Sequence, residues 1–137
     1  MNNAPLPKVL CVDDEPAMLR SLRCSLRGRY EVAVAASGLD VLALLGATKF
    51  DVVISDQRMP GMSGIEFLKR ARQVSQRSVR LLLTCHAEFN AVQASVSDCK
   101  IFRFISKPWD NPHLLKTLSD AARIARIDAP TDTVPAV

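Results

Sequence analysis

The sequence of 137 residues is poor in several features that mark common protein classes. It contains 5 glycines, 2 histidines and 4 cysteines, and the cysteines lie too far apart for a CxxC pair or a compact set of metal ligands. We therefore expect reduced thiols. No apolar run approaches the roughly 18 residues of a membrane span, and residues 1–7 lack the charged and apolar parts of a signal peptide. These absences predict a cytoplasmic protein that does not enter a membrane.

Composition and charge favour one globular domain. Hydrophobic residues account for 48% of the chain and charged residues for 23%, which suits a buried core. The net charge of +4 is compatible with a polyanionic partner. However, no helix-turn-helix, RNP or zinc motif accompanies Arg20, Arg23 and Arg27, which recur along one side of an expected helix. The sequence therefore predicts solvated basic faces and no direct nucleic acid binding by this domain.

Short apolar runs alternate along the chain with stretches of helical periodicity, a pattern typical of an α/β sheet. Most of these runs lack polar alternation, which indicates strands buried on both faces. The expected strands are Val9–Val12, Tyr30–Ala35, Val52–Ile54, Val79–Leu83 and Ile101–Ile105. The expected helices begin at Pro16, at the capping residues Ser37 and Ser63, at Ala87 (continuing to Ser97) and near Asp110.

The alternating order of strands and helices predicts the fold and its limits. Right-handed crossovers place helices on both faces of a parallel sheet, so we expect an α/β, flavodoxin-like (βα)5 three-layer sandwich with strand order 2-1-3-4-5. Residues 8–127 are expected to form the domain, with residues 1–7 as an N-terminal tail. Residues 128–137 contain two prolines and no helical pattern, so we expect a disordered tail or linker stub there.

Polar side chains directly follow the expected strands, at the edge of the sheet where ligands bind in this architecture. These residues are Asp13, Asp14, Glu15, Asp56, Thr84 and Lys107. The carboxylates follow the first and third strands, which are neighbours in the expected order, so they should cluster. Because clustered carboxylates repel one another unless a cation compensates them, these oxygen-only ligands suit Mg²⁺. An acidic pocket beside a lysine and a hydroxyl indicates phosphoryl chemistry.

Two competing enzyme classes lack support at the same positions. A dinucleotide-binding enzyme needs a glycine-rich turn after the first strand, where this chain has Asp13-Asp14-Glu15-Pro16. A phosphatase of the haloacid dehalogenase type would have a DxDx(T/V) motif there, and the segment does not match it. Neither reaction is therefore expected.

Four parts of the sequence form a pattern in their order and spacing: Val12–Pro16, Ser55–Gly64, Thr84 and Phe104–Trp109. Together they resemble the receiver domain of two-component response regulators, and the resemblance covers about residues 8–125. Each motif alone is moderately specific, and their combination is highly specific. The resemblance implies a regulatory phosphoacceptor module with self-catalysed phosphorylation and dephosphorylation, and not a metabolic enzyme.

The resemblance implies roles for the acidic residues. Asp56 would be the phosphoacceptor, whose carboxylate attacks the phosphorus of a phosphohistidine on a partner protein. Asp14, Asp56 and the backbone carbonyl of Arg58 would ligate Mg²⁺, with Mn²⁺ as a substitute. Asp13 would act through a bound water. The ion would offset the repulsion between an anionic nucleophile and an anionic phosphoryl group.

A conformational switch is also implied. Lys107 would pair with one phosphoryl oxygen, and Thr84 would move to donate a hydrogen bond to another. Phe104 would then swing into the space that Thr84 leaves, although an ordinary core aromatic is the alternative for this residue. The change would be transmitted through the face formed by the fourth helix, the fifth strand and the fifth helix. The Lys107-Pro108 peptide bond is expected to be cis.

The chain departs from the family pattern at Cys85, where the usual residue is alanine or glycine. We expect the larger side chain to restrict attacking water and to lengthen the lifetime of the acyl phosphate; a redox role is the alternative. Arg58 and His86, like Cys85, occupy positions that fringe the pocket. These residues are expected to tune hydrolysis.

The implied partners are a sensor histidine kinase or phosphotransfer protein and an output domain or downstream protein. A second copy of the chain, in a homodimer, is a further implied partner. The sequences of the motifs around Arg58 and Phe104 are similar to those of receivers that precede HD-GYP cyclic-di-GMP phosphodiesterase domains or NtrC-type transcription activators. The alternative function is a receiver-like interaction scaffold that is not phosphorylated, and the complete set of polar residues argues against it.

Overall fold

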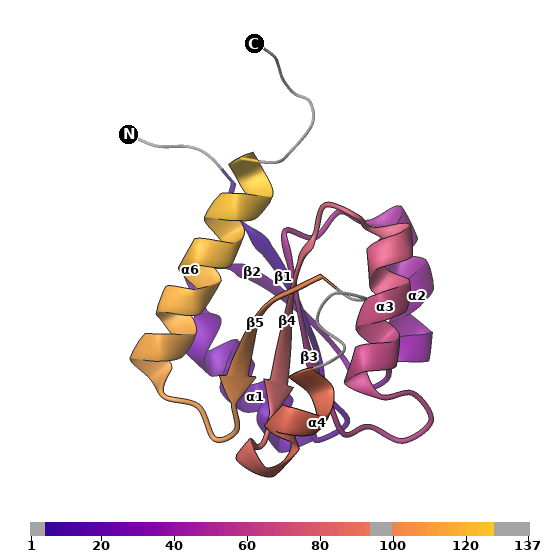
Figure 1. The fold of residues 1–137 in the computed structure, drawn as a ribbon. Coiled ribbons are helices and arrows are strands. Elements are labelled where there is room, and N and C mark those ends of the chain that lie inside the picture. Colours follow the sequence, from indigo (N-terminus) through magenta and orange to yellow (C-terminus); the bar gives the residue numbers. More distant parts are fainter. Residues whose placement is uncertain (1–4, 94–99, 128–137) are drawn as a thin grey trace.

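Five apolar segments of the chain pair into one parallel sheet in the computed structural model, which describes residues 5–93 and 100–127 (Figure 1). The strands are β1 (Lys8–Val12), β2 (Glu31–Ala35), β3 (Val52–Asp56), β4 (Val79–Thr84) and β5 (Ile101–Ser106). They pair in the order β2-β1-β3-β4-β5. The expected fold class and strand order are therefore confirmed.

Helices cover both faces of the sheet and complete three layers. Helices α1 (Pro16–Leu26) and α6 (Asn111–Ile127) pack on one face, and α2 (Gly38–Ala47) and α3 (Gly64–Val74) pack on the other (Figure 1). Among the described residues, none of the helices has the length and apolar character needed to cross a membrane.

Local sequence explains where the helices begin. The Ser37 hydroxyl accepts a hydrogen bond from the backbone N–H of Asp40 at 3.3 Å, and Ser63 caps α3 in the same way at 3.2 Å. The Asp110 carboxylate accepts the N–H three residues further on, at 3.0 Å. Because each cap satisfies an N–H that has no partner within the helix, both predicted serine caps and the Asp110 cap are confirmed.

The segment after β4 differs from the single helix Ala87–Ser97 that the sequence predicts. A 3-10 turn, η1 (His86–Glu88), comes first, and the short helix α4 (Phe89–Gln93) follows it. The N–H of Glu88 donates to the carbonyl three residues earlier at 3.1 Å, which closes the tighter turn. The predicted α-helical start is therefore wrong by two residues, and residues 94–99 lie outside the described part of the chain.

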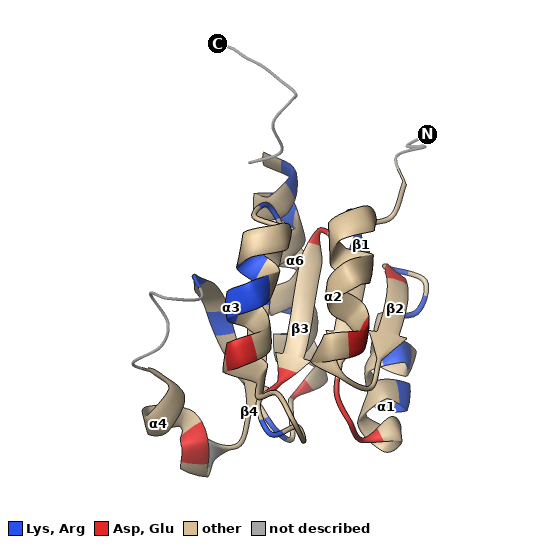
Figure 2. Cartoon of the chain, turned by 90° about the vertical axis from the view of Figure 1, so that its right-hand side faces the viewer, with Lys and Arg blue, Asp and Glu red and all other residues tan. Residues whose placement is uncertain are grey.

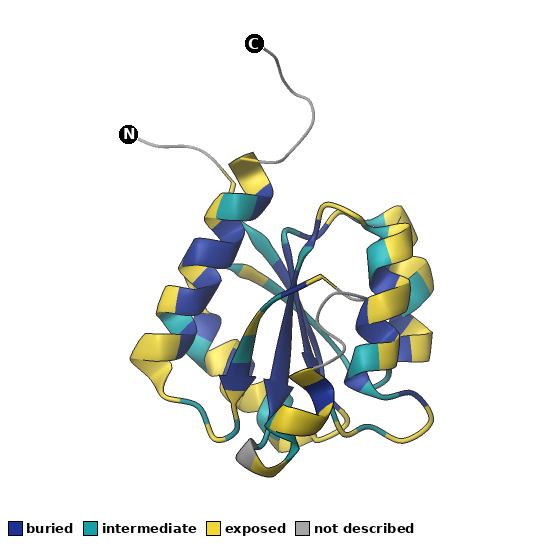
Figure 3. Cartoon of the chain, in the orientation of Figure 1, coloured by how far each residue is buried: buried dark blue, intermediate teal, exposed yellow. Residues whose placement is uncertain are grey.

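Successive strand residues point to opposite faces and supply two separate cores. In β1, Leu10 and Val12 pack toward α2 and α3, whereas Val9 and Cys11 pack toward α1 and α6. The central strands are buried and the edge strands β2 and β5 are partly exposed (Figure 3). Burial raises the pKa of Cys11 to about 12, so this thiol stays neutral and serves packing.

Candidate functional site

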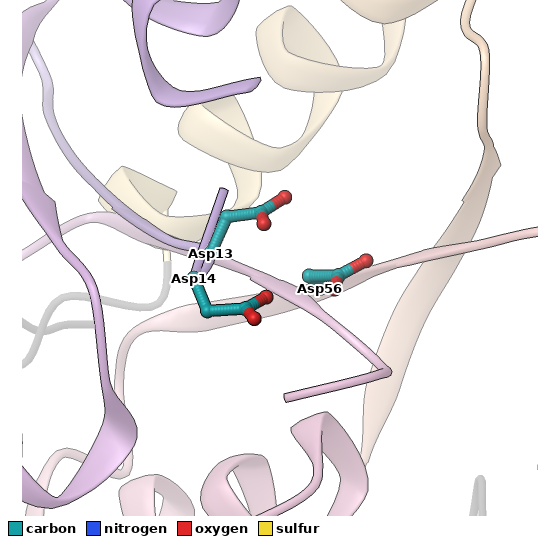
Figure 4. Close-up of side chains that lie close together, drawn as sticks. All are labelled: Asp13, Asp14 and Asp56. Atoms are coloured by element: carbon teal, nitrogen blue, oxygen red, sulfur yellow. The ribbon is translucent and has the colours of Figure 1, made fainter. Parts of the chain in front are cut away.

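The carboxyl ends of β1 and β3 bring three aspartates together. Asp13, Asp14 and Asp56 each offer a carboxylate oxygen, and these oxygens lie within 4.8 Å of one another. The three side chains lie close together and extend in roughly the same direction (Figure 4). Asp13 and Asp56 are buried, and Asp14 is exposed to solvent. The structure thus places the three predicted carboxylates in one cluster, with two donors from adjacent positions on β1's exit loop and one from the end of β3.

Lys107 reaches this cluster from the end of β5. Its Nζ donates to Asp56 Oδ1 at 2.8 Å, and it lies 3.4 Å from an oxygen of Asp13 and 3.5 Å from one of Glu15. The backbone N–H of Lys107 donates to the Thr84 carbonyl at 3.1 Å. The Lys107-Pro108 peptide bond is cis, as the sequence analysis expects. One ammonium therefore contacts three carboxylates, those of Asp13, Glu15 and Asp56, and negative charge remains in excess.

The protonation of these groups reflects burial and crowding. Burial raises the pKa of Asp56 above its ordinary value, and the charges of Asp14 and Glu15 raise it further against the opposing effect of Lys107. Burial also raises the pKa of Asp13. Burial alone would lower the pKa of Lys107, but its hydrogen bond to Asp56 and the charge of Asp13 outweigh that effect and raise it. The lysine therefore stays charged, and an added cation would further stabilise the charged form of the neighbouring carboxylates.

The donor set fits a small divalent cation. Carboxylate oxygens from two adjacent strand ends are the hard ligands that Mg²⁺ prefers, and the exposed position of Asp14 leaves room for water ligands on that side. Among the described residues, no histidine nitrogen or cysteine sulfur belongs to this set of possible metal ligands. The residues present therefore fit a magnesium-type site.

The loop after β3 is folded tightly beneath Asp56. The N–H of Gly64 donates to the carbonyl of Gln57 at 2.9 Å, and the Gln57 side chain accepts the N–H of Ile65 at 2.9 Å. A methyl group at Gly64 would overlap the backbone carbonyl oxygen of Asp56. Sequence reasoning treats Gly64 only as part of a motif, whereas the structure makes it a packing partner of the central aspartate.

Thr84 and Phe104 lie beside a small cavity at the ends of β4 and β5. The buried Thr84 hydroxyl donates a long hydrogen bond of 3.3 Å to the Cys85 carbonyl. The ring of Phe104 meets the ring of Phe89 edge to face, with centroids 5.1 Å apart and planes at 77°. A cavity of about 120 Å³ is lined by residues that include Thr84, Cys85, Phe89 and Phe104. The role of Phe89 is not visible in the sequence because it depends on a contact between two elements.

Residues at the pocket fringe come from two loops. The guanidinium Nε of Arg58 donates to the carboxylate of Glu88 in η1, which joins the loop after β3 to the turn after β4. The hydrogen bond to Glu88 raises the pKa of Arg58, and the charge of Glu88 adds to this effect. Cys85 is half-buried, and His86 begins η1, although the His86 side chain lies outside the description. The sequence singles out Arg58 but gives no signal for its partner Glu88.

Comparisons with known proteins agree with this arrangement. The family model for the response regulator receiver domain matches residues 9–119. The hydrogenase transcriptional regulatory protein HoxA of Bradyrhizobium diazoefficiens is 33% identical over 125 residues, which cover 91% of this chain and 26% of that protein. The transcriptional regulatory protein GlrR of Escherichia coli is 35% identical over 115 residues, covering 82% of this chain and 26% of that protein. The chain thus spans about a quarter of the length of these relatives.

Solved structures show the same architecture. A signal receiver domain of an HD domain-containing protein from Pseudomonas fluorescens has a TM-score of 0.86 and 29% identity, with 93% of this chain and 95% of that chain covered. The chemotaxis protein CheY4 of Vibrio cholerae has a TM-score of 0.77 and 33% identity, with 85% of this chain and 98% of that chain covered. Fold, carboxylate cluster and sequence match together show that this chain belongs to the CheY-like receiver domain family of two-component response regulators.

Proposed function

We propose that the chain is a Mg²⁺-dependent phosphoacceptor switch in which Asp56 receives a phosphoryl group from a sensor histidine kinase or a phosphotransfer protein. The observation that carries the proposal is the 2.8 Å ion pair of Lys107 and Asp56 inside a cluster of three carboxylates. This arrangement supplies a nucleophile, a fixed cation and oxygen ligands in one place. Family membership supports the same assignment.

Asp56 is the proposed nucleophile. A carboxylate oxygen attacks the phosphorus of the donor phosphohistidine, the P–N bond breaks with its electron pair remaining on the imidazole, and an acyl phosphate forms. The ammonium of Lys107 already donates to Asp56, and a short movement of this side chain lets it donate to a phosphoryl oxygen. Thr84 is the proposed hydroxyl donor because its present hydrogen bond, at 3.3 Å, is long and readily exchanged.

The proposed metal ligands are Asp14, Asp56 and the backbone carbonyl of Arg58, and Asp13 would act through water. When bound, Mg²⁺ or Mn²⁺ offsets negative charge between the nucleophile and the phosphoryl group. Both Asp13 oxygens already have protein partners, a backbone N–H at 2.9 Å and the lysine ammonium at 3.4 Å. This arrangement favours a contribution through water over direct ligation by Asp13.

Transmission of the signal is proposed to use Thr84 and Phe104. A shift of Thr84 toward the phosphoryl group enlarges the adjoining cavity, into which the Phe104 ring can turn. Such a turn breaks the edge-to-face contact with Phe89 and changes the surface of α4, β5 and α6. Here α6 is the helix that the sequence analysis counts as fifth.

The domain is proposed to span residues 8–127, with residues 1–7 as a tail; the proposed linker at 128–137 lies outside the described residues. The relatives named as transcriptional regulatory proteins support a transcriptional output, and the receiver from an HD domain-containing protein supports an HD-domain output. We propose that these outputs are of the NtrC type or the HD-GYP type, respectively. A downstream protein or a second copy of the chain is a further target of the switch. Cys85, Arg58 and His86 are proposed to tune hydrolysis at the pocket mouth.

Incubation with acetyl phosphate and Mg²⁺, followed by intact-mass measurement, tests the proposal. We expect a mass gain of about 80 Da that disappears without Mg²⁺ and in Asp56→Asn. Asp40→Asn, which removes an exposed carboxylate in the first turn of α2, is the matched control and should gain the same mass. Absence of the adduct in the wild type, together with no binding of BeF₃⁻, would support the unphosphorylated scaffold instead.

A further inference from the structure

The two ends of the sheet carry opposite charge. The acidic cluster lies at the carboxyl ends of the strands, whereas a basic residue stands at or shortly before the first residue of every strand. These five residues are Lys8, Arg29, Lys49, Arg77 and Lys100. Figure 2 shows the acidic loop after β1 at one end of the molecule and basic segments on the upper turns of α6 at the other. Glu31, the first residue of β2, and Asp51, directly before β3, lie at the same end, so the five basic residues there outnumber two acidic ones. The amino end of the sheet therefore has a net positive charge suited to anions.

A groove at this basic end gathers three arginines. It has a volume of about 330 Å³ and lies between the second half of α6 and the turn that precedes β2. Arg123 and Arg126 line it from the helix, and Arg29 lines it from the turn. The side chains of Tyr30 and Ser119 add two hydroxyl groups. None of the described residues that line the groove carries a carboxylate.

Neighbouring groups do not cancel this charge. Arg123 donates to Asp120 at 2.8 Å, but the same carboxylate also pairs with Lys116 at 3.0 Å and Arg103 at 3.6 Å. Arg126 donates to the backbone carbonyl of Pro5 at 2.9 Å and forms a long ion pair with Asp51, whose Oδ1 lies 3.9 Å from its Nε. The side chain of Arg29 forms no hydrogen bond or ion pair with any described residue. Several guanidinium donors therefore remain available to a ligand.

We propose that this groove is a second binding site, for a small phosphate-bearing anion such as pyrophosphate or a nucleoside monophosphate. Guanidinium groups bind phosphate oxygens in pairs, and three of them suit a ligand with two or more negative charges. Leu115 and Ala122 line the same groove and provide an apolar wall for a flat organic group. The volume lies at the lower end of the range for small-molecule sites.

The tyrosine hydroxyl adds a neutral donor to the site. Burial raises the pKa of Tyr30 although Arg29 lowers it, so the phenol keeps its proton near neutral pH and can donate to a phosphate oxygen. The site is separate from the proposed phosphoacceptor site because it lies at the opposite ends of the strands. Its existence does not depend on phosphorylation of Asp56.

Two natural reporters make the test specific. Tyr30 is the only tyrosine and lies in the groove, whereas Trp109 is the only tryptophan and lies two residues after Lys107. The 137-residue chain carrying Asp56→Asn is titrated with pyrophosphate and with AMP in low-salt, phosphate-free buffer from which Mg²⁺ has been removed by a chelating resin. Calorimetry measures affinity, and NMR follows the Tyr30 ring and the Trp109 indole.

We expect saturable binding that shifts the Tyr30 signals and leaves the Trp109 signal in place. Arg29→Ala and Arg123→Ala should each weaken binding by about tenfold or more. Arg29→Lys, which keeps the charge but loses the paired donors, should weaken it less. Arg70→Ala removes an exposed arginine on α3, outside the groove, and should leave the affinity unchanged. Circular dichroism identifies any variant that fails to fold. If Arg29→Ala does not fold, the affinity of Arg29→Lys is compared with that of the chain that keeps Arg29.

Two results would overturn the proposal. One is that neither pyrophosphate nor AMP binds, whether or not DNA oligonucleotides bind. The other is that Arg70→Ala loses as much affinity as Arg29→Ala and Arg123→Ala. The phosphoacceptor assignment is tested separately on the wild-type chain with Mg²⁺ and BeF₃⁻, where Trp109 is the reporter. Failure of one assignment therefore leaves the other intact.

Discussion

The Nζ atom of Lys107 lies 2.8 Å from Oδ1 of Asp56, although 51 positions separate the two residues in the chain. Asp56 ends β3 and Lys107 follows β5, so the ion pair spans the end of β4, which lies between them in the sheet. The contact is possible because all strands are parallel and present their carboxyl ends at one edge. It sets the resting arrangement from which phosphorylation is proposed to start.

Removal of this ammonium should slow phosphoryl transfer. We expect Lys107→Met to lower the rate of phosphorylation by acetyl phosphate by about 100-fold, because a fixed cation no longer stabilises the developing phosphoryl charge. The rate is measured by quenched time points and intact mass. Lys69→Met, which alters an exposed lysine of α3, should react at the wild-type rate. Equal rates in Lys107→Met and wild type would remove Lys107 from the reaction.

The stability of the metal-free protein should depend on Asp56 in a defined direction. Its pKa is raised in the folded state, so the folded protein binds this proton more tightly than the unfolded chain does. The charged form therefore destabilises the fold near neutral pH, and this effect disappears as pH falls through the raised pKa toward the ordinary value. We expect Asp56→Asn to be more stable than wild type near neutral pH, with the difference shrinking in acid.

Urea unfolding at several pH values, in resin-treated buffer, measures this difference. Asp40→Asn, which removes an exposed carboxylate outside the cluster, is the control against which the stability of Asp56→Asn is compared at each pH. A stability difference between Asp56→Asn and wild type that grew as pH fell would contradict the assigned direction.

The sequence is sufficient for those parts of the site that depend on topology alone. Alternation of apolar runs and helices predicts the strand order, and the strand order places Asp13, Asp14 and Asp56 together. Serine caps at Ser37 and Ser63 are likewise predictable because they act within a few residues. These features follow from local patterns and from one rule about where parallel strands end.

Contacts between distant side chains could not be predicted in this way. The Phe89–Phe104 ring pair and the Arg58–Glu88 ion pair each join two elements whose relative placement no local pattern fixes. The 3-10 turn at η1 was missed because an apolar helical period does not distinguish it from the first turn of an α-helix.

The ring pair should contribute measurable coupling. Because edge-to-face pairs contribute about 1 kcal/mol beyond burial, a double-mutant cycle of Phe89→Leu and Phe104→Leu should give a coupling energy near that value in the unphosphorylated state. The coupling should fall when BeF₃⁻ and Mg²⁺ are present, since the proposed turn of Phe104 separates the rings. Unfolding in urea measures each corner of the cycle. A coupling that BeF₃⁻ leaves unchanged would argue against the switch role of Phe104.

Cys85 should slow loss of the phosphoryl group. It is half-buried at the rim of the cavity that Thr84 and Phe104 also line, so a smaller residue opens a path for water. We expect Cys85→Ala to shorten the lifetime of the acyl phosphate several-fold. The decay of the mass adduct after removal of acetyl phosphate gives the rate. Cys24→Ala, at an exposed position on α1, should not change it, and identical decay in Cys85→Ala and wild type would refute the hypothesis.

A side chain larger than that of glycine at residue 64 should displace Asp56. A methyl group there would overlap the Asp56 carbonyl oxygen, which is backbone and cannot move without displacing the end of β3. We expect Gly64→Ala to lower the free energy of unfolding by about 2 to 3 kcal/mol and to impair phosphorylation.

Gly46, near the end of α2, is the control because a methyl group there would enter open space. Gly46→Ala should therefore stabilise the fold by about 0.5 kcal/mol, because alanine favours the helix, and should leave phosphorylation unchanged. Similar stability of the two variants in urea unfolding would show that β3 and its loop adapt to the added methyl, and would remove Gly64 as a determinant of the site.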